Sequence, residues 1–110
     1  MYEINFNNPI AVHFIGIGGI SMSGLAQILM TNGFKVSGSD NRSSDLTEEL
    51  ERNGATVYIG QSASNINDSL DLVVYTAAIR EDNPEFARCT ELSLPMITRA
   101  ELLGPIMRNY

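Results

Sequence analysis

The residues with the clearest chemical meaning form a glycine-rich segment, Gly16–Met22, that follows an apolar stretch and precedes a helical pattern. A turn of this kind directs backbone N–H groups and the positive end of a helix dipole at one point. Gly16, Gly18 and Ser21 nearly match the G-x-G-x-x-G fingerprint, with serine in the third position. Gly16 suits a tight turn, whereas Gly18 and Gly19 let phosphate oxygens approach the backbone. We therefore predict a phosphate site, although a tight turn without a ligand has the same pattern.

Two polar residues extend this prediction. Ser21 has a side chain at a position where close packing of the helix on the strand favours glycine, so we expect the first helix to lie slightly further from the sheet. Alternatively, the Ser21 hydroxyl bonds a phosphate. Asp40 lies 24 positions after Gly16, where an acid typically accepts hydrogen bonds from ribose hydroxyls. A carboxylate there disfavours a ribose 2′-phosphate, and hence NADP. The alternative for Asp40 is a capping or turn aspartate.

Other chemical groupings are weaker. Thr76–Ile79 follows an apolar run, and its small residues leave room for a ligand or simply make a packed turn. His13 lies inside a strand pattern and is more typical of a core or sheet-face histidine than of a base. The sequence has no metal-ligand spacing, no Ser-His-Asp set and no G-x-x-x-x-G-K-[ST] loop. We predict neither a catalytic residue nor a metal site in this chain.

Composition and charge narrow the possible functions. The chain has 110 residues, of which 44% are hydrophobic and 18% charged, as expected for one globular domain. Its formal net charge of −6, without a run of Lys and Arg, argues against nucleic acid as a partner. No apolar run approaches the ~18 residues of a membrane span, and Met1–Pro9 lacks the basic group of a signal peptide. Cys89 is the only cysteine, so we expect a buried thiol and a reducing, cytoplasmic location.

Apolar strand-like runs alternate with helical patterns along the whole chain. This alternation predicts the α/β class, with a Rossmann-like, doubly wound, mainly parallel sheet of five strands. Strands are expected at Ala11–Ile15, Lys35–Ser39, Thr56–Ile59, Leu72–Tyr75 and Pro95–Ile97. Helices are expected at Ile20–Thr31 and Asp45–Asn53, from Asn83 to Leu92 and after Thr98, with one further helical turn within 60–68. Ligands of such sheets bind beyond the carboxyl ends of the strands, where the strand order reverses.

The helical patterns also predict caps and buried faces. Asp45 with Glu48, and Thr98 with Glu101, have the spacing of a capping box. Pro105 removes an interior N–H and predicts a kink or a restart in the last helix. The apolar spacing predicts buried faces formed by Met22, Leu25, Ala26 and Leu29 in the first helix, by Leu46 and Leu50 in the second, and by Leu102, Leu103, Ile106 and Met107 in the last.

Several segments together resemble the N-terminal domain of the Mur ligases. The run from His13 to Ala26 carries the resemblance most strongly. It continues through Val36–Asp40, Gly54-Ala55, Val73–Ile79, Asn83-Pro84-Glu85 and Arg99–Leu103. The order and spacing match over nearly the whole chain, and the chain is most similar to the members that join L-alanine to UDP-N-acetylmuramate.

This resemblance implies one domain of a larger ligase of peptidoglycan synthesis. In the family, a Rossmann-like first domain holds the UDP part of UDP-N-acetylmuramate. A central domain holds ATP and Mg²⁺, and a third domain brings the amino acid. An acyl phosphate forms on the muramyl carboxyl, and the amine of L-alanine then attacks it. Residues 1–110 resemble the first domain alone, so we expect no cofactor bound by this chain and no turnover by it alone.

The resemblance also assigns roles to residues. It places the turn at the diphosphate, the end of the second strand at the uridine side, and the segment after the fourth strand, with Arg99, along the substrate cleft. Arg99 would supply a charge-assisted bond to an anionic group. The implied substrate-binding residues are Gly16, Gly18, Gly19, Ile20, Ser21, Met22, Ser39, Asp40, Thr76, Ala77, Ala78, Ile79 and Arg99.

Three positions depart from the family pattern, and two other functions remain open. Ser21 replaces a glycine, Gln61 stands where relatives can have a histidine near the uracil, and Gly104-Pro105 interrupts a helix that is usually continuous. The glycine turn and Asp40 also fit an NAD-binding domain of an oxidoreductase. A non-enzymatic nucleotide-sensing module is the third possibility.

Overall fold

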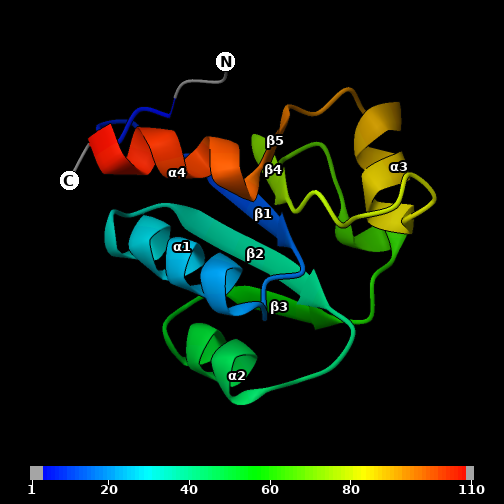
Figure 1. Cartoon of the computed structure of the whole chain (residues 1–110), viewed down its shortest axis with the longest axis horizontal. Helices are drawn as coiled ribbons and strands as arrows, with labels where there is room; N and C mark the ends of the chain where they lie inside the picture. The colour runs from blue at the N-terminus through cyan, green and yellow to red at the C-terminus, as the bar shows by residue number, and fades with distance from the viewer. Residues whose placement is uncertain (1–3, 109–110) are drawn as a thin grey trace.

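Five parallel strands form one sheet in the order β3-β2-β1-β4-β5 (Figure 1). The computed structural model describes residues 4–108. The order reverses between β1 and β4, which confirms the predicted doubly wound α/β architecture. The elements are β1 (Ala11–Ile15), α1 (Ile20–Thr31), β2 (Lys35–Asp40), α2 (Asp45–Arg52), β3 (Thr56–Ile59), the 3₁₀ turn η1 (Ala63–Asn65), β4 (Leu72–Tyr75), α3 (Pro84–Glu91), β5 (Met96–Thr98) and α4 (Arg99–Arg108).

Side chains on the two faces of the sheet form two apolar clusters. In the larger cluster, Val12 and Phe14 of β1 pack with residues of α1 and α4. The smaller cluster joins Ile15 and Val73 to Cys89 of α3. Alternate residues of β1 therefore face opposite layers, as the pleat of a strand requires. Strands β1 and β4 at the centre of the sheet are buried on both faces, which accounts for their nearly continuous apolar sequences.

The first three helices form where the sequence predicts them, with one correction to a cap. The predicted apolar stripe of α1 is buried, and Asn83 caps α3 with Pro84 at its first position. In α2, however, Ser44 is the N-cap and forms the capping box with Thr47, not Asp45 with Glu48. Ser44 lies one residue earlier and its hydroxyl reaches the N–H of Thr47 at 3.3 Å. Thr47 and Leu50 are therefore the buried residues, and Leu46 of the predicted face is only half-buried.

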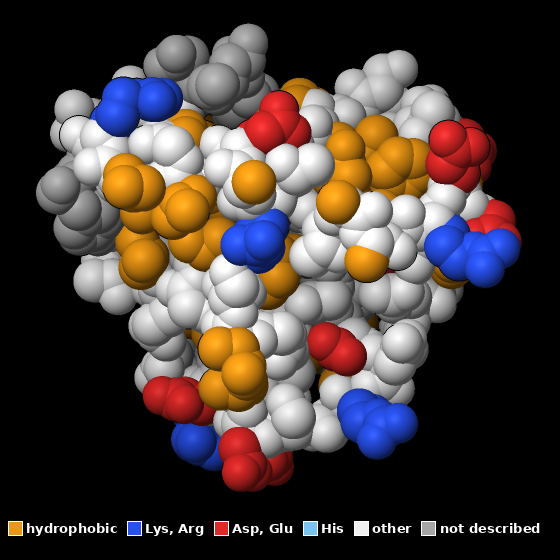
Figure 2. Space-filling model, in the orientation of Figure 1, with side chains coloured by type: hydrophobic (Ala, Val, Ile, Leu, Met, Phe, Trp, Pro, Cys, Tyr) orange, Lys and Arg blue, Asp and Glu red, His pale blue; other side chains and the backbone are white. Residues whose placement is uncertain are grey.

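Helix α4 differs from the expectation in continuity and in its buried face. Thr98 and Glu101 form the predicted reciprocal cap. Pro105, however, lies inside an unbroken helix, so the predicted restart is wrong. Burial of Pro105 between the buried Leu102 and Ile106 offsets the missing N–H. The predicted buried face is too wide, because its other two members lie one position further round the helix and are exposed, Leu103 at 41% and Met107 at 66%. Figure 2 shows hydrophobic side chains at the surface over α4.

Three elements differ from their predicted bounds by one residue. Strand β2 continues to Asp40, which pairs with Ile59 of β3. Strand β5 is Met96–Thr98 instead of Pro95–Ile97, so Thr98 both closes the strand and caps α4. Helix α2 ends at Arg52 with Asn53 as its C-cap. The shift in β2 matters most, because the backbone of Asp40 is then held by pairing with β3.

Gly38 is the glycine of β2 on which the turn after β1 depends. A Cβ built on Gly38 would lie 2.5 Å from Cβ of Ile17, which is fully buried. The absence of a side chain at this position lets Ile17 pack against the strand. Gly24 of α1 is the contrasting case, since a Cβ there would meet nothing within 4 Å.

We expect Gly38→Ala to lower the free energy of unfolding by about 1–3 kcal/mol, because overpacking forces Ile17 and the turn to move. Gly24→Ala, the matched control, should raise the free energy of unfolding by about 0.5–1 kcal/mol through helix propensity. Urea unfolding of both variants measures this difference. Equal effects of the two substitutions would contradict the packing argument.

Candidate functional site

The predicted site residues come together at one edge of the sheet, beyond the carboxyl ends of the strands. Parallel pairing places the ends of β1, β2, β4 and β5 along this edge. The glycine turn follows β1, Asp40 ends β2, Thr76–Ile79 follows β4, and Arg99 follows β5. The strand order reverses between β1 and β4 at the centre of this edge. Such a switch point is where open α/β sheets bind ligands.

The turn itself is held by backbone hydrogen bonds. Gly16 has a φ of +88°, a conformation that favours glycine. The N–H groups of Gly16 and Ile17 both donate to the carbonyl of Ser39, at 2.8 and 2.9 Å. The N–H of Gly19 donates back to the carbonyl of Gly16 at 3.2 Å. These bonds confirm the predicted tight turn and fix the direction in which α1 begins.

Helix α1 begins without a cap. Its N-cap residue is Gly19, which makes no side-chain capping hydrogen bond, and the first turn contains no acidic residue. The N–H groups of the first three residues have no carbonyl partner earlier in the helix. Ile20 is 87% exposed, so this end of the helix faces solvent. Uncapped N–H groups and the positive end of a helix dipole together favour an anion here.

Asp40 contacts the turn directly. Its Oδ2 accepts a hydrogen bond from the N–H of Gly18 at 2.8 Å, and its Oδ1 accepts one from the N–H of Asn41 at 2.8 Å. A Cβ on Gly18 would lie 2.7 Å from Oδ2. The glycine at position 18 is therefore required by the close approach of Asp40. The hydrogen bond from the N–H of Asn41 is typical of a turn aspartate, which was the alternative interpretation of Asp40.

Ser39 is placed differently from the expectation that it faces the ligand. Its side chain is fully buried, and its hydroxyl donates to Oε1 of Glu85 at 2.8 Å. Its backbone carbonyl, in contrast, holds the glycine turn as described above. Ser39 thus reaches the site through its main chain.

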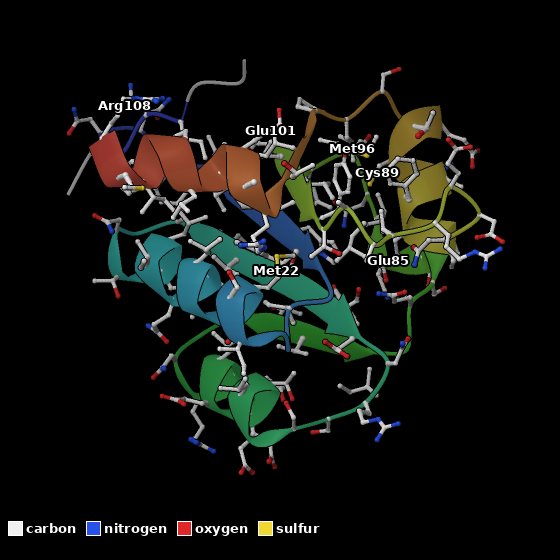
Figure 3. All side chains as sticks on the ribbon, viewed as in Figure 1. Met22, Glu85, Cys89, Met96, Glu101 and Arg108 are labelled. Atoms are coloured by element: carbon white, nitrogen blue, oxygen red, sulfur yellow. The ribbon has the colours of Figure 1, made fainter. Side chains whose placement is uncertain are left out.

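Ser21 and Arg99 form a contact between the starts of α1 and α4. Ser21 is exposed, so it does not hold α1 away from the sheet, and that prediction is wrong. The neighbouring Met22 is the residue that packs inward (Figure 3). Arg99 Nη1 donates to the hydroxyl of Ser21 at 3.1 Å. Within residues 4–108 the guanidinium of Arg99 has no acidic partner, so a positive charge stands beside the uncapped helix.

A cavity of about 300 Å³ opens on the other side of Gly16. Of the residues predicted after β4, Thr76, Ala78 and Ile79 line it, whereas Ala77 is exposed and does not. The remaining lining residues are Ile15, Gln61, Arg80, Asp82 and Asn83. The site therefore has two parts, the start of α1 and this cavity, with Gly16 between them.

A buried carboxylate beneath the site was missed by sequence reasoning. Glu85, in the first turn of α3 (Figure 3), is fully buried. Its Oε1 accepts hydrogen bonds from His13 Nε2 and the hydroxyl of Ser39, both at 2.8 Å. Its Oε2 accepts from the N–H of Ser62 at 3.1 Å and from Asn65 Nδ2 at 2.9 Å. In the sequence, Asn83-Pro84-Glu85 indicates a helix start and belongs to the family resemblance, but neither observation predicts that Glu85 is buried. A histidine within an apolar strand is the signal for a buried acidic partner.

These contacts set the protonation of two buried groups. Burial raises the pKa of the Glu85 carboxyl, but hydrogen bonds from His13, Asn65 and Ser39 outweigh it and hold the pKa below its ordinary value of 4.5. Burial, together with the charge of Glu85, raises the pKa of the Cys89 thiol to about 11. Cys89 is thus a buried, unreactive thiol, as predicted.

Two negative findings apply to the described part of the chain. Residues 4–108 contain no group of three or more His, Cys, Asp or Glu placed to hold a metal ion. No helix in that range is long and apolar enough to cross a membrane.

A doubly wound parallel sheet with a glycine turn at its switch point is the architecture of the Rossmann-like class of α/β domains. Within that class, the family model for the Mur ligase family, catalytic domain, matches residues 11–110. The chain belongs to the Mur ligase family.

Individual relatives agree with this family. The chain is 66% identical to UDP-N-acetylmuramate–L-alanine ligase of Lachnospira eligens over 110 residues, which is all of this chain and 24% of that protein. The crystal structure of UDP-N-acetylmuramate-alanine ligase from Thermotoga maritima matches 91% of this chain and 23% of its own, with 35% identity and a TM-score of 0.85. The chain thus spans about a quarter of the length of these relatives.

Oxidoreductases share the fold alone. Shikimate dehydrogenase from Aquifex aeolicus matches 87% of this chain and 44% of its own, with a TM-score of 0.55 and 16% identity. A likeness at that identity reports the common sheet and not a common ligand. The NAD-binding alternative is therefore not favoured.

We expect Glu85→Gln to lower the free energy of unfolding by about 3 kcal/mol at neutral pH, since an amide cannot accept all the donors that converge on the carboxylate. Because the pKa of Glu85 is lowered on folding, its contribution is complete above pH 4.5 and is lost as pH falls through the lower, folded pKa. Glu85→Gln should therefore flatten the acid side of the stability profile. Denaturant titrations from pH 3 to 7 measure both effects.

The exposed Glu51 supplies the control, and Glu51→Gln should leave both the stability and its pH dependence nearly unchanged. If Glu85→Gln loses stability with falling pH as steeply as the wild type, other carboxyl groups cause the acid dependence of the stability.

Proposed function

We propose that this chain is the UDP-N-acetylmuramate-binding domain of the ligase that joins L-alanine to UDP-N-acetylmuramate in peptidoglycan synthesis. The observation that carries the proposal is the uncapped start of α1 at the switch point, with Arg99 beside it. Three first-turn N–H groups, a helix dipole and a guanidinium suit a diphosphate. The names of the most similar relatives support the choice of sugar nucleotide.

The two parts of the site accommodate the two parts of such a ligand. The diphosphate lies at Gly18–Met22, where Ser21 and Arg99 add a hydroxyl and a charge. Asp40 lies next to the turn, and its carboxylate can accept hydrogen bonds from ribose hydroxyls. Residues 76–79 border the cavity beside Gly16. These residues bind and orient the substrate and take no part in bond making.

The chemistry belongs to the rest of the ligase. In the proposed reaction, ATP phosphorylates the muramyl carboxyl, and the amine of L-alanine displaces the phosphate to form the amide. This chain has no G-x-x-x-x-G-K-[ST] loop for ATP, so ATP, Mg²⁺ and L-alanine are held by other parts of the protein. We therefore propose no turnover by this chain alone. A cytoplasmic location, where ATP is supplied, and a role in cell shape and division belong to the same proposal.

Calorimetric titration of the 110-residue chain with UDP-N-acetylmuramate, UDP and NAD tests the proposal. We expect saturable binding of the first two and none of NAD. Asp40→Ala and Arg99→Gln should each weaken UDP binding about tenfold, since each removes a hydrogen bond to a charged or hydroxyl group.

Arg52→Gln, at the exposed end of α2, is the matched control because it removes the same charge away from the site. Its UDP affinity should equal that of the wild type. Binding of NAD without binding of UDP would contradict the proposal.

A further inference from the structure

The side chain of Asn83 has a fixed orientation because it caps α3. Its Oδ1 accepts hydrogen bonds from the backbone N–H groups of Glu85 and Phe86, at 2.9 and 3.3 Å. A carboxamide whose oxygen faces two N–H groups presents its NH₂ group on the other side. Asn83 Nδ2 accordingly donates to Gln61 Oε1 at 2.5 Å.

This orientation is passed on to Gln61. Gln61 Oε1 accepts the hydrogen bond from Asn83, so the remaining polar group of the Gln61 side chain is Nε2. This nitrogen carries two N–H donors and no acceptor. No hydrogen bond from Nε2 to another group occurs within residues 4–108. Gln61 lines the cavity beside Gly16 together with Thr76 and Ile79. The protein therefore presents a hydrogen-bond donor to whatever occupies this cavity.

The backbone around Gln61 is held on both sides. The N–H of Ser62 donates to Oε2 of Glu85 at 3.1 Å. Asn65 Nδ2 donates both to the same oxygen and to the carbonyl of Gly60, at 2.9 and 3.1 Å. The loop that carries Gln61 is thus tied to a fully buried carboxylate, so the donor is positioned before any ligand arrives.

The walls of the cavity suit a flat ring. Ile15, Ala78 and Ile79 supply apolar surface, and Arg80 and Asp82 at the rim bond one another at 3.3 Å. A mostly apolar cavity with a few oriented polar groups is typical of sites for planar ligands. The anionic part of the ligand is proposed to bind at the start of α1, on the other side of Gly16, which leaves this cavity for an uncharged part.

We propose that Asn83 is a positioning residue that sets the hydrogen-bond polarity of Gln61, and that this pair selects a pyrimidine with a carbonyl acceptor over one with an amino donor. The inference rests on the proposed binding of a UDP-sugar, with the pyrimidine in the cavity. Uracil offers a carbonyl oxygen to Gln61 Nε2. Cytosine has an amino group at the corresponding carbon, and two donors would then face each other.

Paired titrations with UDP and CDP test this inference. The wild-type chain should prefer UDP by about tenfold or more. Asn83→Asp keeps the capping oxygen, since Asp is a good N-cap, but places an acceptor where Asn83 has its NH₂ group. Gln61 then turns its nitrogen toward position 83 and its oxygen toward the cavity. The preference for UDP should disappear or reverse, although residue 83 acts on the ligand only through Gln61.

Gln61→Glu is the second variant, because it accepts from Asn83 and offers only an acceptor to the cavity. Its added charge weakens both ligands, so the ratio of the two affinities is the readout, and the preference should again be lost. Asn53 and Gln27 provide a matched control, since Asn53 Nδ2 donates to Gln27 Oε1 at 2.8 Å between α2 and α1. Asn53→Asp should leave the preference unchanged.

The outcomes separate the two claims. Thermal unfolding and binding of inorganic pyrophosphate show whether each variant retains its fold and the site at α1. UDP binding with a wild-type preference in both Asn83→Asp and Gln61→Glu overturns this inference and leaves the proposed function standing. A wild-type chain that binds neither UDP nor pyrophosphate overturns the proposed function and, with it, this inference.

Discussion

The carboxylate of Glu85 is the interaction on which the site depends. It is buried among segments that are distant in the sequence, and it accepts hydrogen bonds from β1, β2 and the loop around η1. Each of those donors would be costly to bury without an acceptor. The same carboxylate connects to the glycine turn, because Ser39 bonds it by its hydroxyl and holds the turn by its carbonyl. One acidic group thus fixes the turn and the wall of the cavity together.

This arrangement separates the groups that bind from the groups that position. The side chains proposed to bind the ligand are exposed or half-buried, namely the Ser21 hydroxyl, the Asp40 carboxylate, the Gln61 amide and the Arg99 guanidinium. The central positioning groups, His13, Ser39 and Glu85, are fully buried, and no buried polar side-chain atom within residues 4–108 lacks a hydrogen-bond partner. Loss of the buried Glu85 carboxylate would therefore lower stability as well as binding, whereas loss of the Arg99 guanidinium would lower binding alone.

Sequence patterns predicted the sheet well because burial on both faces leaves long apolar runs with clear breaks. The glycine turn after β1 and the start of α3 were predicted from glycines and from Asn-Pro, whereas the end of β2 was placed one residue too early. Sequence patterns failed where the burial or contacts of a side chain depend on how distant segments pack together. The width of the buried face of α4 depends on how the helix is rotated against the sheet, so Leu103 and Met107 were misplaced. The family resemblance placed Ser39 at the ligand, but its hydroxyl bonds Glu85, a partner 46 positions away in the sequence.

If a diphosphate is held mainly by backbone N–H groups, as proposed above, the rate of binding has an unusual dependence on salt. The chain carries a net charge of −6, so a nucleoside diphosphate meets long-range repulsion as it approaches. The attraction at the start of α1 acts only over the last few ångströms, where dissolved salt screens little. Moderate ionic strength should therefore speed the encounter with the ligand while barely loosening the complex. Proteins that attract phosphates mainly through many surface lysines and arginines show the reverse, whereas here Arg99 adds a single guanidinium to the backbone N–H groups.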